Sequence, residues 1–288
     1  MLENLIFCYL VMSTKADKKI KLQQEGLCRL TGMRGRFVAS HILPRALTVL
    51  SRSGEKVREA SLGARPRWRP ATWYDDRLVI KEGEDILREI DTPAIEELRK
   101  HKLVWSSFKC DAPFFPEDLT PLGEGTNLRE ICLGSADKLR MFFLSIVWRA
   151  AASSRPEFVN VQLTEEILED LRQRVLAQDA GNVWDYPIVL DQLITRGAAL
   201  NRTPIMENMD LAVNGIKDHV SVVSVRIYLD GLVAKVILAK GLDLDRSAGG
   251  LFLGALDKSV ILARPFEQSR TKDDMIEVIS DNQRRGYA

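Results

Sequence analysis

The sequence predicts an α+β fold, with an N-terminal ββα-like unit, a central helical body, and a C-terminal antiparallel β-hairpin or sheet. Three observations support this prediction. Residues 27–40 contain two short strand-like runs separated by a glycine turn, and a proline-initiated helix follows them. Residues 137–154 place bulky apolar side chains at helical spacing. Near the C-terminus, two runs rich in Val and Ile flank Asp230-Gly231, a pair typical of hairpin turns.

The chain is long enough for one large domain or two modest ones, with 288 residues of which 45% are hydrophobic and 28% charged. We expect an extension and lead-in over residues 1–24 and a ββα region over residues 25–112. A helical body with the C-terminal sheet is expected over residues 126–288. The stretch from Pro113 to Gly125 carries Pro and Gly, so we place the internal boundary there.

The N-terminal elements surround one histidine. His41 ends the second strand, and Pro44 is suited to the first turn of a helix over residues 45–50. Residues 51–72 are expected to be a loop. Two helices follow, one over residues 82–90 and a second that starts at Thr92-Pro93 and ends near Lys102.

The later elements follow from periodicity. After the long helix of residues 137–154 we expect a second helix over 164–177, with acidic residues first and arginines later, as the helix dipole favours. The remaining expectations are strands over residues 221–229, 232–239, 251–253 and 260–263, and an exposed helix over 272–285.

The net charge of +1 hides an asymmetry, because residues 1–72 carry a net +9 and residues 73–288 a net −8. Such a division indicates either a basic patch that meets phosphates or a basic segment neutralised by acidic helices within the fold. Both readings stay open at this point.

The four cysteines form no Cys-x-x-Cys pair, and they suggest buried or idle thiols in a reducing compartment. The apolar run at residues 5–12 is shorter than the roughly 20 residues of a membrane-spanning helix. We therefore expect a cytoplasmic protein without a membrane partner.

His41 is the candidate catalytic residue. Histidine has a pKa near neutrality, so it suits proton transfer. A histidine at the end of a β-hairpin, just before a helix, has the same position as the general base of a ββα-metal nuclease. The alternative is that His41 caps a turn or forms a hydrogen bond in the core.

The segment Cys28-Arg29-Leu30-Thr31-Gly32, followed by Phe37-Val38-Ala39-Ser40-His41-Ile42-Leu43-Pro44, resembles the first half of an HNH endonuclease motif. The segment Leu144-Ser145-Ile146-Val147-Trp148-Arg149-Ala150 is similar to a helix in uncharacterised bacterial and phage relatives of that family. The resemblance implies a metal-dependent nuclease with His41 as general base. It also suggests a setting in a phage, a prophage or a bacterial antiviral defence locus.

The chain departs from the family pattern at the ligands. Thr31 stands where a second knuckle cysteine is expected and the later cysteine pair is missing, which argues against a structural zinc. By spacing, Asp75 or Asp76 takes the place of the middle Asn of the family and Glu84 the place of its last His or Asn. Carboxylates can hold Mg²⁺ or Mn²⁺. The alternative is that these three residues are solvated acids.

The hypothesis from the sequence is an HNH-like nuclease that hydrolyses DNA, or RNA, with Arg45, Arg67 and Arg69 holding phosphate. The competing hypothesis is an inactive nuclease-derived module that binds nucleic acid or a protein partner. A third is a structural subunit that assembles as a homo-oligomer.

Overall fold

The computed structural model of the chain describes residues 24–48, 57–60, 67–69, 72–108, 118–197, 200–212, 219–241 and 246–286. The fold is α+β. The α-helices are α1 (Lys81–Lys100), α2 (Ala136–Ala152), α3 (Glu165–Ala177) and α4 (Arg270–Arg284). The strands are β1 (Glu25–Leu27), β2 (Arg34–Arg36), β3 (Ser40–His41), β4 (Val57–Ala60), β5 (Arg67–Arg69), β6 (Tyr74–Asp75), β7 (Leu119–Gly123), β8 (Thr126–Ile131), β9 (Ile188–Leu193), β10 (Leu200–Arg202), β11 (Ile205–Ala212), β12 (His219–Leu229), β13 (Leu232–Ile237) and β14 (Ser259–Arg264).

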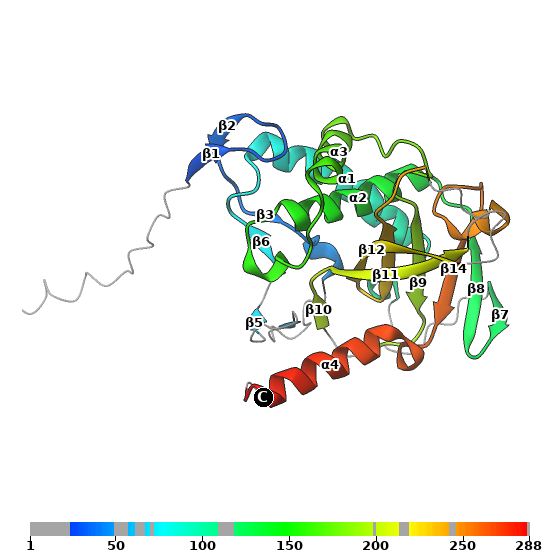
Figure 1. Cartoon of the computed structure of the whole chain (residues 1–288). Coiled ribbons are helices and arrows are strands. Elements are labelled where there is room, and N and C mark those ends of the chain that lie inside the picture. The colour runs from blue at the N-terminus through cyan, green and yellow to red at the C-terminus, as the bar shows by residue number, and fades with distance from the viewer. Residues whose placement is uncertain are drawn as a thin grey trace, which may run out of the picture.

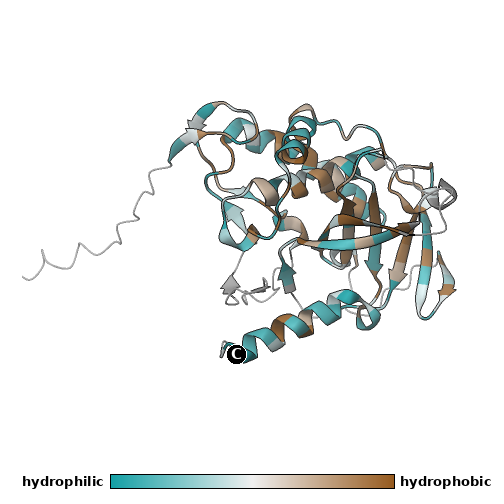
Figure 2. Ribbon diagram, in the orientation of Figure 1, coloured by the Kyte–Doolittle hydropathy of each residue, from teal (hydrophilic) through white to brown (hydrophobic). Residues whose placement is uncertain are grey.

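A seven-stranded sheet is the largest element, with the strand order β11-β12-β13-β9-β14-β8-β7. All its pairs are antiparallel except β9 with β14, so the sheet is mixed and not purely antiparallel as expected. Figure 1 shows α1, α2 and α3 gathered on one side of the sheet and α4 apart from them. Helix α2 is central, because every residue from Leu139 to Ala150 is buried. Figure 2 shows apolar colour concentrated in α2 and the inner strands.

One hydrophobic core joins the parts that the sequence suggested were separate. Its buried members run from Cys28 in the N-terminal region, through α1, α2 and α3, to Ile261 on β14. The expected boundary at Pro113 to Gly125 is described only from residue 118, and there β7 forms the edge strand of the large sheet. The N-terminal region is therefore packed into the body rather than linked to it loosely.

The ββα order is formed by β3, β6 and α1. Strand β3 pairs antiparallel with β6, with Ser40 opposite Asp75 and His41 opposite Tyr74, and five residues connect β6 to α1. The first hairpin, β1 with β2, turns through residues 28–33, earlier than the expected turn at Gly32–Gly35.

The expectation of a loop over residues 51–72 is wrong where the structure describes that stretch. There β4 and β5 pair antiparallel, and β4 also pairs in parallel with β10. The rest of that stretch, apart from residue 72, lies outside the described residues.

The helix predictions were mostly confirmed, with one instructive error. Helices α2, α3 and α4 match their predicted ranges within two residues, and Thr164 caps α3 through its hydroxyl. The two helices predicted for residues 82–102 are one helix, α1, with Pro93 inside it. The buried stripe of Leu87, Ile90, Ala94 and Leu98 runs unbroken past the proline. Packing of that stripe outweighs the backbone hydrogen bond that proline cannot donate.

Two short elements also differ from expectation. The helix expected over residues 45–50 is a 3-10 turn, Arg45–Leu47, where the structure describes it. Residues 251–253 do not form a strand, because Leu251 ends another 3-10 segment, Arg246–Leu251, and Phe252 makes an isolated bridge to Val189. Within the part of the chain that the structure describes, no helix has the length and apolar character needed to cross a bilayer.

The predicted hairpin at Asp230-Gly231 is confirmed, and it explains one glycine. Both residues have positive φ angles, 48° and 84°. A Cβ on Gly231 would overlap the indole of Trp105, whose Nε1 donates to the carbonyl of Leu193 over 2.7 Å. The turn therefore needs glycine for its backbone and for the buried tryptophan beside it.

We predict that Gly231→Ala lowers the free energy of unfolding by at least about 2 kcal/mol more than Gly32→Ala does. Gly32 is the matched control, because its φ is also positive but no atom lies within 4 Å of an added Cβ. Urea denaturation of both variants measures the difference. Equal losses would show that contact with Trp105 adds nothing to the backbone strain.

Candidate functional site

Two of the predicted site residues, His41 and Glu84, come from β3 and α1, and the structure adds Ser40 on β3. Ser40 and His41 are the paired residues of β3, and Glu84 lies in the first turn of α1. The Ser40 hydroxyl lies near enough to the Glu84 carboxylate to lower its pKa. Ser40 and Glu84 therefore approach each other at the junction of the β3–β6 pair with α1, and His41 is the next residue of the same strand.

The pKa of His41 lies below its ordinary value of 6.5. Burial is the largest cause, and the positive charges of Arg45 and Arg149 act in the same direction, while Asp91 opposes them. The imidazole is consequently neutral at pH 7, and a ring nitrogen is available to accept a proton.

Glu84 has the opposite shift. Burial raises its pKa, Asp91 adds to the rise, and Ser40, Arg149 and Lys81 oppose it. Ser40 Oγ and Glu84 Oε2 are buried, and neither has a hydrogen-bond partner of good geometry among the described residues. Such oxygens are costly to bury unless something else satisfies them. They are thus available to a cation or to water.

Arg149 connects this site to the helical body. Its side chain is 1% exposed, and it donates to the carbonyl of His41 over 3.0 Å. It also donates to both carboxylate oxygens of Asp91, over 2.7 and 3.0 Å, and to the backbone carbonyl and hydroxyl of Ser145 on its own helix. The guanidinium therefore joins β3, α1 and α2 at one point.

Asp75 does not fit the ligand role that its spacing suggested. It is 3% exposed, and one oxygen accepts from the backbone N–H of Arg77. The other accepts from the Ser153 hydroxyl over 2.7 Å and from the N–H of Ser154 over 3.2 Å. Both oxygens are thus engaged, the first in the turn after β6 and the second in tying β6 to the C-terminal end of α2, which indicates a structural role. Asp76, the neighbouring candidate, is exposed.

The phosphate-binding candidates are only partly described. Arg45 is exposed, and its charge reaches His41. Arg67 and Arg69 lie on β5, but the structure does not describe their side chains.

Tyr74 lies edge-on to His41 with ring centroids 6.4 Å apart, and the Arg155 guanidinium lies 5.9 Å from the Tyr74 centroid. A half-buried ring with a cation on it and an imidazole beside it is compatible with contact to a nucleic acid.

The turn that contains Cys28 and Thr31, where a zinc knuckle would lie, does contact the start of α1, but through packing and not through a metal site. Thr31 donates its N–H to the Cys28 sulfur over 3.4 Å, and a Cβ on Gly83 would lie 3.0 Å from that sulfur. Cys28, Leu30 and Ile80 are all buried in the common core. Apolar contacts thus connect the turn to α1.

Metal ligands are few. Among the residues that the structure describes, no group of three or more His, Cys, Asp or Glu side chains could hold a metal ion. A cation at this site would have Glu84 and Ser40 as its protein ligands, beside His41. Mg²⁺ commonly binds proteins through one or two carboxylates, with waters and substrate phosphates completing its shell, so this pair fits a cation that enters with the substrate.

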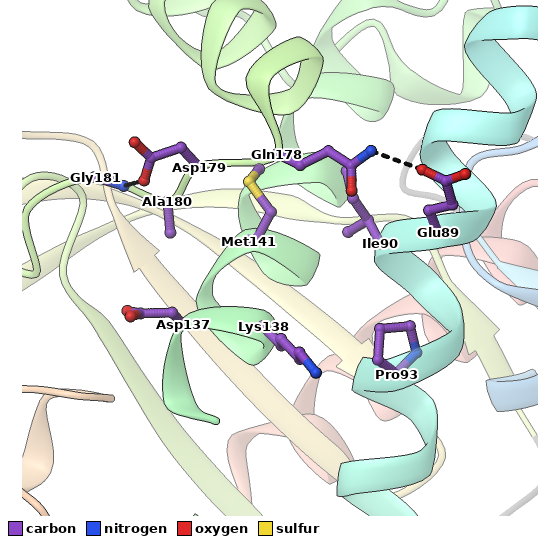
Figure 3. Close-up of a pocket in the computed structure, with 10 residues that line it drawn as sticks. All are labelled: Glu89, Ile90, Pro93, Asp137, Lys138, Met141, Gln178, Asp179, Ala180 and Gly181. Atoms are coloured by element: carbon purple, nitrogen blue, oxygen red, sulfur yellow. Dashed lines mark hydrogen bonds between the residues drawn. The ribbon is translucent and has the colours of Figure 1, made fainter. Parts of the chain in front are cut away.

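A separate cavity of about 250 Å³ lies between α1, α2 and the loop after α3 (Figure 3). Glu89, Asp137 and Asp179 contribute carboxylates and Lys138 an amine, while Gln178 donates to Glu89 over 2.8 Å. Glu89 lies on a different face of α1 from Glu84, since five residues of helix rotate a side chain by more than a third of a turn. The cavity is therefore distinct from the His41 site.

Comparison with protein-family models, with curated proteins and with solved structures finds no match.

Sequence reasoning missed Asp91 and the role of Arg149. One signal was present, because an arginine within the apolar run Phe142 to Ala152 must either be paired or distort the helix. Its partners could not be read from the sequence, since His41 is 108 residues away.

We predict that Asp75→Ala lowers the free energy of unfolding by about 3 kcal/mol, because three donors lose their shared acceptor, the buried carboxylate of Asp75. Asp76→Ala, the adjacent exposed control, should change it by less than about 0.5 kcal/mol. Chemical denaturation compares the two variants. Similar small losses in the two variants would indicate that the link between β6 and α2 does not stabilise the fold.

We also predict that His41 titrates below pH 6.5 in the metal-free protein. Because the unfolded chain binds this proton more readily, His41 should make the free energy of unfolding fall as the pH drops through about 6.5. The chain has three histidines, so imidazole NMR signals can be followed individually and His41→Gln assigns the one of interest. A midpoint at or above 6.5 would contradict the burial and the two arginine charges.

Proposed function

We propose that this protein is a metal-dependent nuclease that hydrolyses phosphodiester bonds, with DNA as the first substrate to test. The observation that carries the proposal is the approach of β3 to the first turn of α1, where Ser40 Oγ and Glu84 Oε2 are buried without a hydrogen bond of good geometry. His41 follows Ser40 on β3, and it shares the charged neighbours Arg149 and Asp91 with Glu84. The resemblance to HNH endonucleases suggests the same chemistry and a cytoplasmic role in phage biology or antiviral defence.

His41 is the general base in this proposal. Its neutral imidazole takes a proton from the water that attacks phosphorus, and the oxygen of the leaving nucleotide then departs with the bonding electrons. Arg45 is exposed beside His41 and offers a positive charge to a non-bridging phosphate oxygen. The lowered pKa of His41 supports the role, because a protonated imidazole could not accept the proton.

Glu84 and Ser40 are the residues that would hold a divalent cation, Mg²⁺ or Mn²⁺. When bound, such a cation supplies a Lewis acid that stabilises the charge developing on the phosphoryl oxygens. It would also stabilise the ionised form of Glu84, which burial disfavours. Asp75 has no part in this set, since its oxygens serve the fold.

A second candidate function is a nuclease-derived module that binds nucleic acid without cutting it. It is favoured by a specific observation, namely that two arginine charges, Arg45 and Arg149, act on His41 while only one carboxylate, Asp91, opposes them. Such a site suits a phosphate anion as well as a metal cation.

We predict that the purified protein nicks plasmid DNA with Mg²⁺ or Mn²⁺ and that chelation stops the reaction. His41→Ala should lower the rate by roughly 10²- to 10⁴-fold, as expected for loss of a general base. Glu84→Gln should lower it through weaker cation binding, so that more metal is needed. Gel assays of plasmid and single-stranded DNA measure both effects.

Glu82→Gln is the matched control, because Glu82 is also an acid in the first turn of α1 but is exposed. It should cut as the wild type does. Cutting that survives both His41→Ala and Glu84→Gln would contradict the proposed site. If the protein retains DNA without cutting it, and Arg45→Ala releases that DNA, the binding module is the correct function.

A further inference from the structure

We propose that Arg149 is a positioning residue that holds His41 in register with Glu84, so that the helical body completes the site of the ββα unit. The inference rests on the proposed function for its consequence in catalysis. Its structural content, the coupling of His41 to α2, stands independently of that function. No substrate contact is assigned to Arg149, since it is fully buried.

The guanidinium of Arg149 is completely satisfied. Arginine has five N–H donors, and here the acceptors are the His41 carbonyl, the two oxygens of Asp91, and the carbonyl and hydroxyl of Ser145. A buried charge with all donors paired is held in one orientation. The position of Arg149 is thus fixed by its surroundings, and the groups it binds are fixed in turn.

These contacts reach both halves of the site. His41 lies on β3, and Asp91 lies on α1 seven residues after Glu84, two helical turns along the same face. One side chain from α2 therefore bonds to the strand that carries the proposed base and to the helix that carries the proposed cation ligand. A shift of Arg149 would change the separation of His41 from Glu84.

The requirement is specific for arginine. A lysine at this position would keep the charge but has three donors on one nitrogen, so it could not bridge Asp91 in bidentate fashion and reach His41 as well. Ser145 lies one turn before Arg149 and donates its hydroxyl to the Phe142 carbonyl. The hydrogen bonds between Ser145 and Arg149 explain why the segment Leu144-Ser145-Ile146-Val147-Trp148-Arg149-Ala150 carries two polar residues within a buried helix.

Helix α2 supplies a matched control. Arg140 is also 1% exposed, and it pairs with Asp137 on its own helix and with the carbonyls of Ala180, Gly181 and Asn182. It bonds to no residue of β3 or α1. Arg140→Lys and Arg149→Lys therefore make the same chemical change in two buried sites of one helix. Only the second change reaches His41.

The test compares plasmid nicking by full-length Arg149→Lys, Arg140→Lys, His41→Ala and the double variant Arg149→Lys with His41→Ala, at a temperature where all are folded. Arg149→Lys should lower kcat about 100-fold with KM near the wild-type value, as expected when a reacting group is displaced by about 1 Å. Arg140→Lys should leave kcat unchanged. The double variant should be no slower than His41→Ala alone, because both changes act through His41.

Imidazole NMR separates failure of this inference from failure of the proposed function. The His41 signal should move in Arg149→Lys and stay in place in Arg140→Lys, whether or not the protein cuts DNA. If the wild type cuts nothing but the signal moves as expected, positioning stands and the nuclease proposal falls. If the signal is unchanged in Arg149→Lys, or if both lysine variants lose activity in proportion to their loss of stability, Arg149 has a structural role only.

Discussion

The ion pair between Arg149 and Asp91 is the interaction on which the rest of this structure depends. A buried guanidinium is tolerated only when its donors are paired, and here the pairing requires β3, α1 and α2 to meet. The surrounding core is shared from Cys28 to Ile261, so the N-terminal unit has no separate interior. A division of the chain near residue 113 would therefore break one core and leave Arg149 with Ser145, on its own helix, in place of His41 and Asp91.

The same constraint shapes the chemistry of the site. Burial and nearby arginines keep His41 neutral, and burial raises the pKa of Glu84 toward its uncharged form. These two shifts produce an available base beside an acid that gains from a positive charge. The charged groups that surround them, Arg45, Arg149 and Asp91, come from three different segments. The electrostatics of the site therefore belong to the whole fold rather than to a local motif.

Periodicity and turn chemistry were sufficient for much of the fold. The stripe in α2, the cap at Thr164 and the pair Asp230-Gly231 each act locally, so the sequence predicts them well. It fails where packing overrides local preference, as at Pro93 in α1. All six residues of the inner strand β9 are buried, so buried and exposed positions do not alternate along it. Without that alternation the sequence gives no periodic signal of a strand there. For the site, spacing selected His41, Asp75 and Glu84 alike as candidates. Asp75 shows that spacing cannot distinguish a ligand from a carboxylate engaged by a distant donor such as Ser153.

The central claim is that Ser40, His41 and Glu84 form one phosphodiester-binding centre completed by the helical body. A crystal structure of His41→Ala with a short DNA duplex and Mn²⁺ tests it most directly, because manganese is located by its anomalous signal. The account predicts manganese on Glu84 and Ser40, with a DNA phosphate beside the missing imidazole. Manganese or DNA bound on another face, with Glu84 and Ser40 making no contact to either, would contradict it.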